Sequence, residues 1–162
     1  MPSEYIESSR ARDLPIRNFF HAKAGLATAT CLPQKIAKVA KSLGMIIHYH
    51  NRSKLSDEKE QGAIYHDNIK SLFSVSDVLS ICCPATKETE NMINKETVEF
   101  FPKGAVITNV ARGDIVDDEA LIDALNRRKV YAVGLDVYQN EPNLNPGYLK
   151  HKSAFILPHL GS

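Results

Sequence analysis

The sequence contains no tryptophan, few aromatic residues and only three cysteines, Cys31, Cys82 and Cys83. An odd number of cysteines without regular spacing argues against a disulfide-stabilised secreted fold. No apolar run approaches the ~20 residues that a membrane-spanning helix needs, and the polar residues 1–12 lack the apolar centre of a signal peptide. We therefore expect a cytoplasmic protein that is stabilised by an apolar core.

The chain also lacks an excess of charge of either sign. Its 20 basic and 19 acidic residues leave a formal net charge of +1 at pH 7. Nucleic acids and anionic membranes select strongly basic surfaces, so the composition argues against both partners. With 162 residues, 43% of them hydrophobic, the chain is long enough to form one globular domain with a sizeable core.

From Gln34 onward, short apolar runs alternate with helical patterns. The apolar positions of the first helical pattern are Ile36, Val39, Ala40 and Leu43, and Gly44 is a typical helix stop. Further helices are expected over residues 68–75 and 95–100, and from a cap at Asp117 or Asp118. Expected strands cover residues 45–49, 63–65, 78–83, 105–109, 130–137 and 154–157. The alternation predicts an α/β fold, a doubly wound parallel sheet of the Rossmann-like type with helices on both faces.

Polar residues follow several of these strands. They lie in residues 109–117 (N-V-A-R-G-D-I-V-D), 134–137 (G-L-D-V), 141–142 (E-P) and 157–162 (L-P-H-L-G-S). Open α/β sheets bind their ligands at the carboxyl ends of the strands. An arginine, a carboxylate and a histidine in this order are therefore expected to converge on one site.

These blocks resemble the signature sequences of the D-2-hydroxyacid dehydrogenases. The run C-P-A-T with E-T at residues 83–89 resembles a further block of that family, and H-Y-H-N-R-S at residues 48–53 is similar to its glyoxylate and hydroxypyruvate reductase branch. The resemblance covers residues 34–162 and places the blocks in the family's order. It implies hydride transfer between NAD(P)H and a small 2-keto acid, glyoxylate or hydroxypyruvate, to give the D-2-hydroxy acid.

The resemblance implies three catalytic residues. Arg112 would grip the substrate carboxylate and keto oxygen, because a guanidinium offers a rigid fork of donors. His159 would act as the general acid that protonates the carbonyl oxygen, and Glu141 would hold its imidazolium. The alternatives are a surface salt bridge for Arg112, an ordinary loop histidine and a solvated turn carboxylate. The matching blocks favour the catalytic roles.

The cofactor is expected to be NADP(H), with NAD(H) possible in its place. An NAD enzyme usually places an acid after the second strand to bond the ribose 2′-hydroxyl, whereas this chain has Asn51, Arg52 and Ser53 there. Arg52 and Ser53 suit a 2′-phosphate; the alternative is a solvated loop arginine. The resemblance implies further cofactor contacts at Cys83, Pro84, Thr89, Val110, Ala111, Asp136 and Gly161. Asp136 is expected to bond the carboxamide or order the nicotinamide ring.

The expected glycine-rich turn is the largest departure from the family. A dinucleotide fold uses G-x-G-x-x-G after its first strand, where glycines permit close approach to the pyrophosphate. Counting back from Gln34 places these glycines at Thr28, Thr30 and Pro33. Side chains there would crowd the diphosphate, and Pro33 removes a backbone donor. The abrupt change before Gln34 favours a reading-frame shift or an assembly error in this segment.

The domain organisation follows from these observations. We expect an unassigned segment over residues 1–25 and an incomplete dinucleotide-binding domain over residues 26–162, with its first strand within residues 25–32. The family's substrate domain has no counterpart in the sequence, so we expect little or no turnover by this chain alone. The family also implies a homodimer. No metal is expected, since His48 and His50 share a strand face without a third ligand. The open alternatives are a non-catalytic dinucleotide-binding module, similar to corepressor relatives, and a non-functional gene product.

Overall fold

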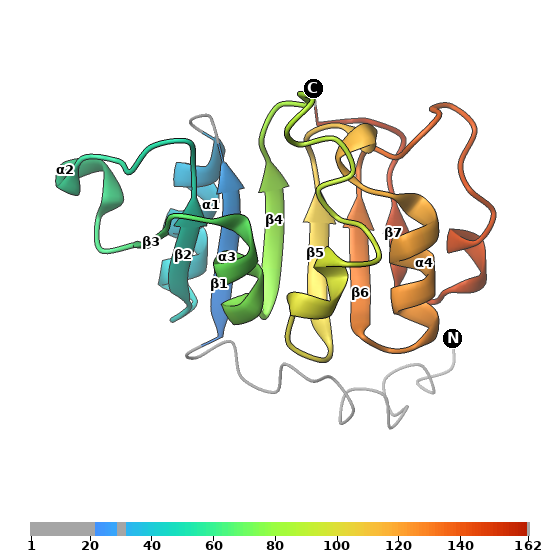
Figure 1. Cartoon of the computed structure of the whole chain (residues 1–162), viewed down its shortest axis with the longest axis horizontal. Coiled ribbons are helices and arrows are strands. Elements are labelled where there is room, and N and C mark those ends of the chain that lie inside the picture. Colours follow the sequence, from blue (N-terminus) through green and yellow to red (C-terminus); the bar gives the residue numbers. More distant parts are fainter. Residues whose placement is uncertain (1–21, 29–31, 162) are drawn as a thin grey trace, which may run out of the picture.

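The computed structural model describes residues 22–28 and 32–161, which form one parallel sheet flanked by helices (Figure 1). The seven strands of this region are β1 (Lys23–Thr28), β2 (Ile46–His50), β3 (Ile64–His66), β4 (Val78–Cys82), β5 (Ala105–Asn109), β6 (Val130–Leu135) and β7 (Ala154–Ile156). The helical segments are α1 (Leu32–Ser42), α2 (Asp57–Glu60), α3 (Ile69–Val75), η3 (Thr97–Phe100), η4 (Gly113–Ile115), α4 (Asp118–Asn126) and η5 (Tyr148–Lys150).

The sheet has the strand order β3-β2-β1-β4-β5-β6-β7, and every pairing is parallel. All carboxyl ends therefore meet at one edge, which is the upper edge in Figure 1. The order reverses between β1 and β4, so this is the switch point at which doubly wound sheets bind ligands. Helix α1 lies behind the sheet, and α3 and α4 lie in front of it (Figure 1). The predicted fold class is confirmed.

Apart from the first, the expected strands form within two residues of the predicted bounds, because they are apolar runs, and the sheet buries most residues of the central ones. In β4, for example, four of the five residues are buried. The helix expected over residues 68–75 forms as α3, with Asn68 as its cap: its Oδ1 accepts the Ser71 N–H at 2.8 Å. Asp117 caps α4 in the same way through the Ala120 N–H, at 3.1 Å.

The first strand differs from the prediction. It covers Lys23–Thr28 instead of lying within residues 25–32, and α1 already begins at Leu32. Pro33 explains the early helix start, since the fixed φ of proline suits the first turn and its missing N–H has no partner to lose there. Thr28 ends β1, and Pro33 is buried in the first turn of α1. Thr30 and Cys31 lie outside the described residues.

The buried face of α1 also differs from the prediction. Val39 and Leu43 are 61% and 50% exposed, whereas Ala40 is buried and Ile36 and Ala37 pack against the core. The alanines let the helix approach β1 and β2 closely, so the helix is rotated away from its larger apolar side chains. Helical spacing alone did not distinguish these two faces.

Two hydrophobic clusters form the core. The larger one packs α3, η3 and α4 against β4, β5 and β6 and includes Phe73, Ile107, Leu121 and Tyr148. The smaller one joins α1 to β1 and β2 through residues such as Leu26 and Ile47. Among the residues that the structure describes, no helix is long and apolar enough to span a membrane.

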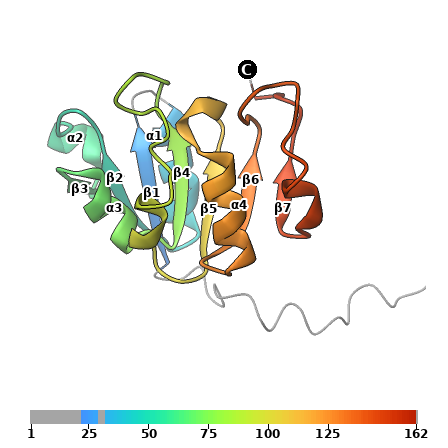
Figure 2. The same cartoon turned by 45° about the vertical axis from the view of Figure 1, so that its right-hand side comes forward.

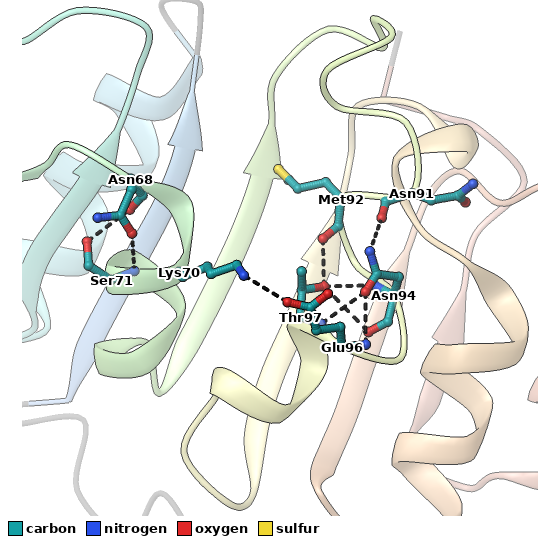
Figure 3. Close-up of polar contacts among 8 residues, drawn as sticks. All are labelled: Asn68, Lys70, Ser71, Asn91, Met92, Asn94, Glu96 and Thr97. Carbon is teal, nitrogen blue, oxygen red and sulfur yellow. Dashed lines mark hydrogen bonds and ion pairs between the residues drawn. The ribbon is translucent and has the colours of Figure 1, made fainter.

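A network of polar side chains holds the segment between β4 and β5, which the sequence patterns did not reveal (Figure 3). Asn94 Oδ1 accepts the Glu96 and Thr97 N–H groups at 2.9 and 3.0 Å, and Thr97 Oγ1 accepts the Asn94 N–H at 2.9 Å. Lys70 of α3 bonds Glu96 at 2.8 Å. These contacts fix the segment that leads from β4 to the predicted site.

Candidate active site

The predicted catalytic residues lie on loops that follow β5, β6 and β7. These loops gather at the carboxyl edge of the sheet, the upper edge in both views (Figure 2). Arg112 follows β5, Glu141 follows β6 and His159 follows β7. The parallel topology thus brings together residues that are up to 47 positions apart in the sequence (159 − 112).

Glu141 and His159 form a direct ion pair or hydrogen bond. His159 Nδ1 lies 2.8 Å from Glu141 Oε2, and the two side chains are 36% and 30% exposed. The hydrogen bond from His159 lowers the pKa of Glu141, so the carboxylate is the stable form. A carboxylate can only accept, and therefore His159 Nδ1 carries the hydrogen. Nε2, the other ring nitrogen, is not used by this contact.

The backbone around His159 is held by Asp136. Its Oδ1 accepts the Leu160 N–H at 2.8 Å and its Oδ2 accepts the Gly161 N–H at 2.7 Å. A side chain at Gly161 would lie 2.7 Å from Asp136 Oδ2 and would push this carboxylate from its place. His159 itself has a φ of 57°, a left-handed conformation that costs ~1–2 kcal/mol for a residue other than glycine. The two hydrogen bonds to buried Asp136 offset that cost and hold the backbone that follows His159.

Arg112 is exposed at the end of β5, and its Nη1 donates to the neighbouring Ala111 carbonyl at 2.7 Å. The turn that presents it is organised by Asn109, which is fully buried. Asn109 Nδ2 donates to the Arg112 carbonyl at 2.8 Å, and its Oδ1 accepts the Ala111 N–H at 3.0 Å. Asn109 was missed as a positioning residue, although a polar residue at the end of a buried strand is a recognisable signal.

The turn after Arg112 packs directly on the loop that carries Glu141. A methyl group at Gly113 would lie 2.1 Å from the Tyr138 carbonyl oxygen and 2.7 Å from the Gln139 nitrogen. Only a residue without a side chain permits this contact between two backbone segments. The structure thereby joins the Arg112 turn to the Glu141–His159 pair.

The residues expected at the ribose end lie directly after β2. Arg52 and Ser53 are exposed, and the Arg52 N–H donates to Asn51 Oδ1 at 3.0 Å. Exposed guanidinium and hydroxyl groups beside the switch point have the donor chemistry that a phosphate requires. At this end of the edge, the described residues therefore offer polar donors to a dinucleotide.

The remaining predicted cofactor contacts line the turns after β4 and β5. Thr89 Oγ1 donates to the Pro84 carbonyl at 2.8 Å and closes the turn after β4. Burial raises the pKa of the Cys83 thiol to about 11, so Cys83 is a packing residue with no nucleophilic character. Val110 is 40% exposed and Ala111 is partly buried beside Arg112.

Histidines on β2 and β3 form a separate pair, in which His48 is buried and His66 is partly buried. Ser71 Oγ donates to the Asn68 carbonyl, so it accepts from His66 Nδ1 at 2.9 Å. His66 Nε2 is then an acceptor for His48 Nδ1, also at 2.9 Å. Both rings are neutral in this arrangement. Within the described residues, no group of three histidine, cysteine or acidic side chains could hold a metal ion.

Comparisons with known proteins agree with this architecture. A profile of the family described as D-isomer specific 2-hydroxyacid dehydrogenase, NAD binding domain, matches residues 3–161. The curated glycerate dehydrogenase of Hyphomicrobium methylovorum is 41% identical over 131 residues, which are 80% of this chain and 41% of that protein. The chain spans 38–41% of the length of the first curated relatives it matches.

Two solved structures are similar to the whole described region. The glyoxylate reductase from Paecilomyes thermophila has a TM-score of 0.84 at 38% identity, and the match covers 89% of this chain and 44% of that one. An NADPH-dependent glyoxylate/hydroxypyruvate reductase from Sinorhizobium meliloti, solved with NADP and malonate, has a TM-score of 0.82 at 30% identity over 88% and 44% of the two chains.

The parallel sheet, its switch point and the polar residues along its carboxyl edge define a dinucleotide-binding domain of the oxidoreductase class. The chain belongs to the D-isomer specific 2-hydroxyacid dehydrogenase family, as its NAD-binding domain. The family resemblance expected from the sequence motifs is confirmed. Its starting point at residue 34 was wrong, because the profile extends upstream to residue 3.

Proposed function

We propose that this chain is the cofactor-binding part of an NADPH-preferring reductase that converts glyoxylate or hydroxypyruvate to the D-2-hydroxy acid. The observation that carries the proposal is the 2.8 Å contact between His159 Nδ1 and Glu141 Oε2 at the carboxyl edge of the sheet. A dinucleotide-binding fold alone would not need this pair. Asp136 holds the backbone next to His159, and His159 itself adopts an unfavourable left-handed conformation. Strain of this kind is typical of functional sites, so it supports a chemical role for the pair.

Arg112 and His159 divide the chemistry between them. The guanidinium of Arg112 binds the substrate carboxylate and polarises the keto oxygen, which draws electron density away from the keto carbon. When bound, the reduced nicotinamide supplies the hydride to that carbon. His159 Nε2 gives its proton to the oxygen at the same time, and the hydroxyl group is complete. Glu141 stabilises the protonated imidazole before transfer, and the partly exposed ring regains its proton from water.

The cofactor preference rests on the residues after β2. Arg52 and Ser53 would hold the 2′-phosphate of NADP(H), and Asn51 fixes the turn through the Arg52 N–H. At the other end, Asp136 and Gly161 lie beside the expected nicotinamide, with Thr89, Val110, Cys83, Pro84 and Ala111 on the turns between. The resemblance at residues 48–53 supports glyoxylate or hydroxypyruvate as the substrate, and so does the similarity to a glyoxylate reductase and a glyoxylate/hydroxypyruvate reductase.

Nucleotide binding tests the cofactor assignment. Calorimetry on the 162-residue chain should show tighter binding of NADPH than of NADH. Arg52→Ala removes a charged hydrogen bond, so it should weaken NADPH binding by roughly 10–150-fold and leave NADH binding unchanged. The matched control is Lys54→Ala, which removes a neighbouring loop cation that pairs with Glu60 at 3.5 Å. An equal loss of NADPH affinity in Arg52→Ala and Lys54→Ala would refute phosphate recognition by Arg52.

A non-catalytic dinucleotide-binding module is the second candidate function. It is favoured by Thr28 and Pro33, which stand at positions where the resemblance implies glycine. Glyoxylate-dependent oxidation of NADPH at high protein concentration distinguishes the two candidates. We expect at most a trace rate, lost in His159→Gln. Tight NADPH binding with no His159-dependent rate would support the non-catalytic module.

A further inference from the structure

The loop that carries Glu141 is tied at both ends to one residue, Asp118 at the start of α4. Near its beginning, Gln139 Oε1 accepts the Asp118 N–H at 3.3 Å. At its end, the Tyr148 hydroxyl donates to Asp118 Oδ1 at 2.8 Å. These contacts span 21 and 30 positions of sequence and enclose Glu141 between them.

The Tyr148–Asp118 contact is buried, which sets it apart from the surface ion pairs of this chain. Tyr148 is 1% exposed and lies in the larger core cluster, and Asp118 is 5% exposed. Burial raises the pKa of both groups. A phenylalanine would fill the same space but would leave the buried Asp118 carboxyl group without its hydroxyl partner, so packing alone does not account for the pair. The contact instead fixes where the loop returns to the domain.

The same anchor reaches the other turns of the site. Gln139 Nε2 donates to Asn91 Oδ1 at 3.2 Å, and the Asn91 N–H donates to the Asp114 carbonyl at 2.8 Å. The backbone of residues 138–139 also packs on Gly113. One glutamine amide thus connects the turn after β4, the Arg112 turn and α4 to the loop that carries Glu141.

We propose that Asp118 is a positioning residue, which holds Glu141 against His159 through Gln139 and Tyr148. The inference rests on the proposed function, since that function gives the Glu141–His159 pair its use. The geometry assigns Asp118 no contact with substrate or cofactor. Its effect is to restrict the loop to the one arrangement in which Glu141 meets His159 Nδ1.

The test separates positioning from general stability. In the 162-residue chain, Tyr148→Phe removes the hydroxyl from Asp118, and Gln139→Met breaks the partly exposed end of the anchor. The matched control is Ser76→Ala, which also removes one buried hydroxyl, bonded to the Leu72 carbonyl at 2.7 Å before β4. Asp118→Asn is the rescue variant, because its amide oxygen still accepts from Tyr148.

The readout is the titration midpoint of the Glu141 carboxyl carbon by NMR, with thermal melting measured beside it. In Tyr148→Phe and Gln139→Met, we expect the midpoint to rise by ~0.5 pH unit or more, because the bond from His159 is weakened. Ser76→Ala and Asp118→Asn should leave it unchanged. Unchanged midpoints in both loop variants would overturn the proposal, whatever their melting temperatures. No cofactor enters this experiment, so its outcome is independent of NADPH binding and turnover.

Discussion

Substitution of Gly113 by alanine tests the contact between the Arg112 turn and the Glu141 loop. The added methyl would lie 2.1 Å from the Tyr138 carbonyl oxygen, whereas an ordinary carbon–oxygen contact is ~3.3 Å. One of two backbone segments must therefore retreat by about 1.2 Å. Overpacking of this kind costs about 1–3 kcal/mol, which corresponds to a fall in Tm of roughly 3–9 °C. Thermal melting by circular dichroism measures this loss.

The matched control is Gly134→Ala on β6. A methyl group there would meet only Thr108 Cγ2, at the ordinary distance of 3.5 Å. Alanine also reduces the conformational freedom of the unfolded chain, so Gly134→Ala should leave Tm unchanged or raise it slightly. Equal Tm values for the two variants would show that the Gly113 contact is loose, and the turns would then not be joined as described.

Two further predictions concern stability. Burial lowers the pKa of His48 and of His66, so the unfolded chain takes up protons that the folded chain does not. The two neutral histidines contribute their full share of the free energy of unfolding above the ordinary pKa of 6.5, and this share is lost as the pH falls below that value. Urea unfolding at pH 8 and at pH 5.5 should therefore show a lower free energy of unfolding at pH 5.5. A free energy of unfolding that does not change between the two pH values would contradict the neutral state of the His48–His66 pair. Asn94→Ala removes the cap of the segment in Figure 3 and should cost ~1–2 kcal/mol in urea unfolding, and an unchanged midpoint would exclude a stabilising role.

The fold was predictable because the strands are compact apolar runs, and the sheet buries most residues of the central ones, such as β2 and β4. Residues 105–109 show this best, since the predicted strand and β5 have the same bounds. The face of α1 was not predictable from helical spacing. Val39 and Leu43 have the right period, but close packing on β1 and β2 favours the smaller Ala37 and Ala40.

The candidate site was predictable at the level of residue types and not at the level of contacts. The positions of Glu141 and His159 after parallel strands implied one edge, and their 2.8 Å contact agrees with the expected pair. Asp136 was expected to face the cofactor, and the structure shows both of its oxygens bonded to backbone N–H groups beside His159. Long-range contacts of this kind depend on loop conformations that have no periodic pattern in the sequence.

The core is divided into two clusters, and each supports a different part of the candidate site. This division explains how the Glu141–His159 part can match the family motifs while the segment of the expected glycine-rich turn does not. Thr28 and Pro33, which stand where the glycine-rich turn was expected, lie on β1 and α1, which pack through the smaller cluster. The loops of Glu141 and His159 follow β6 and β7, which pack with Tyr148 through the larger cluster. Among the described residues these clusters are separate, so changes near the expected pyrophosphate site need not displace the Glu141–His159 pair. Cofactor affinity and the geometry of Glu141 and His159 should therefore vary independently.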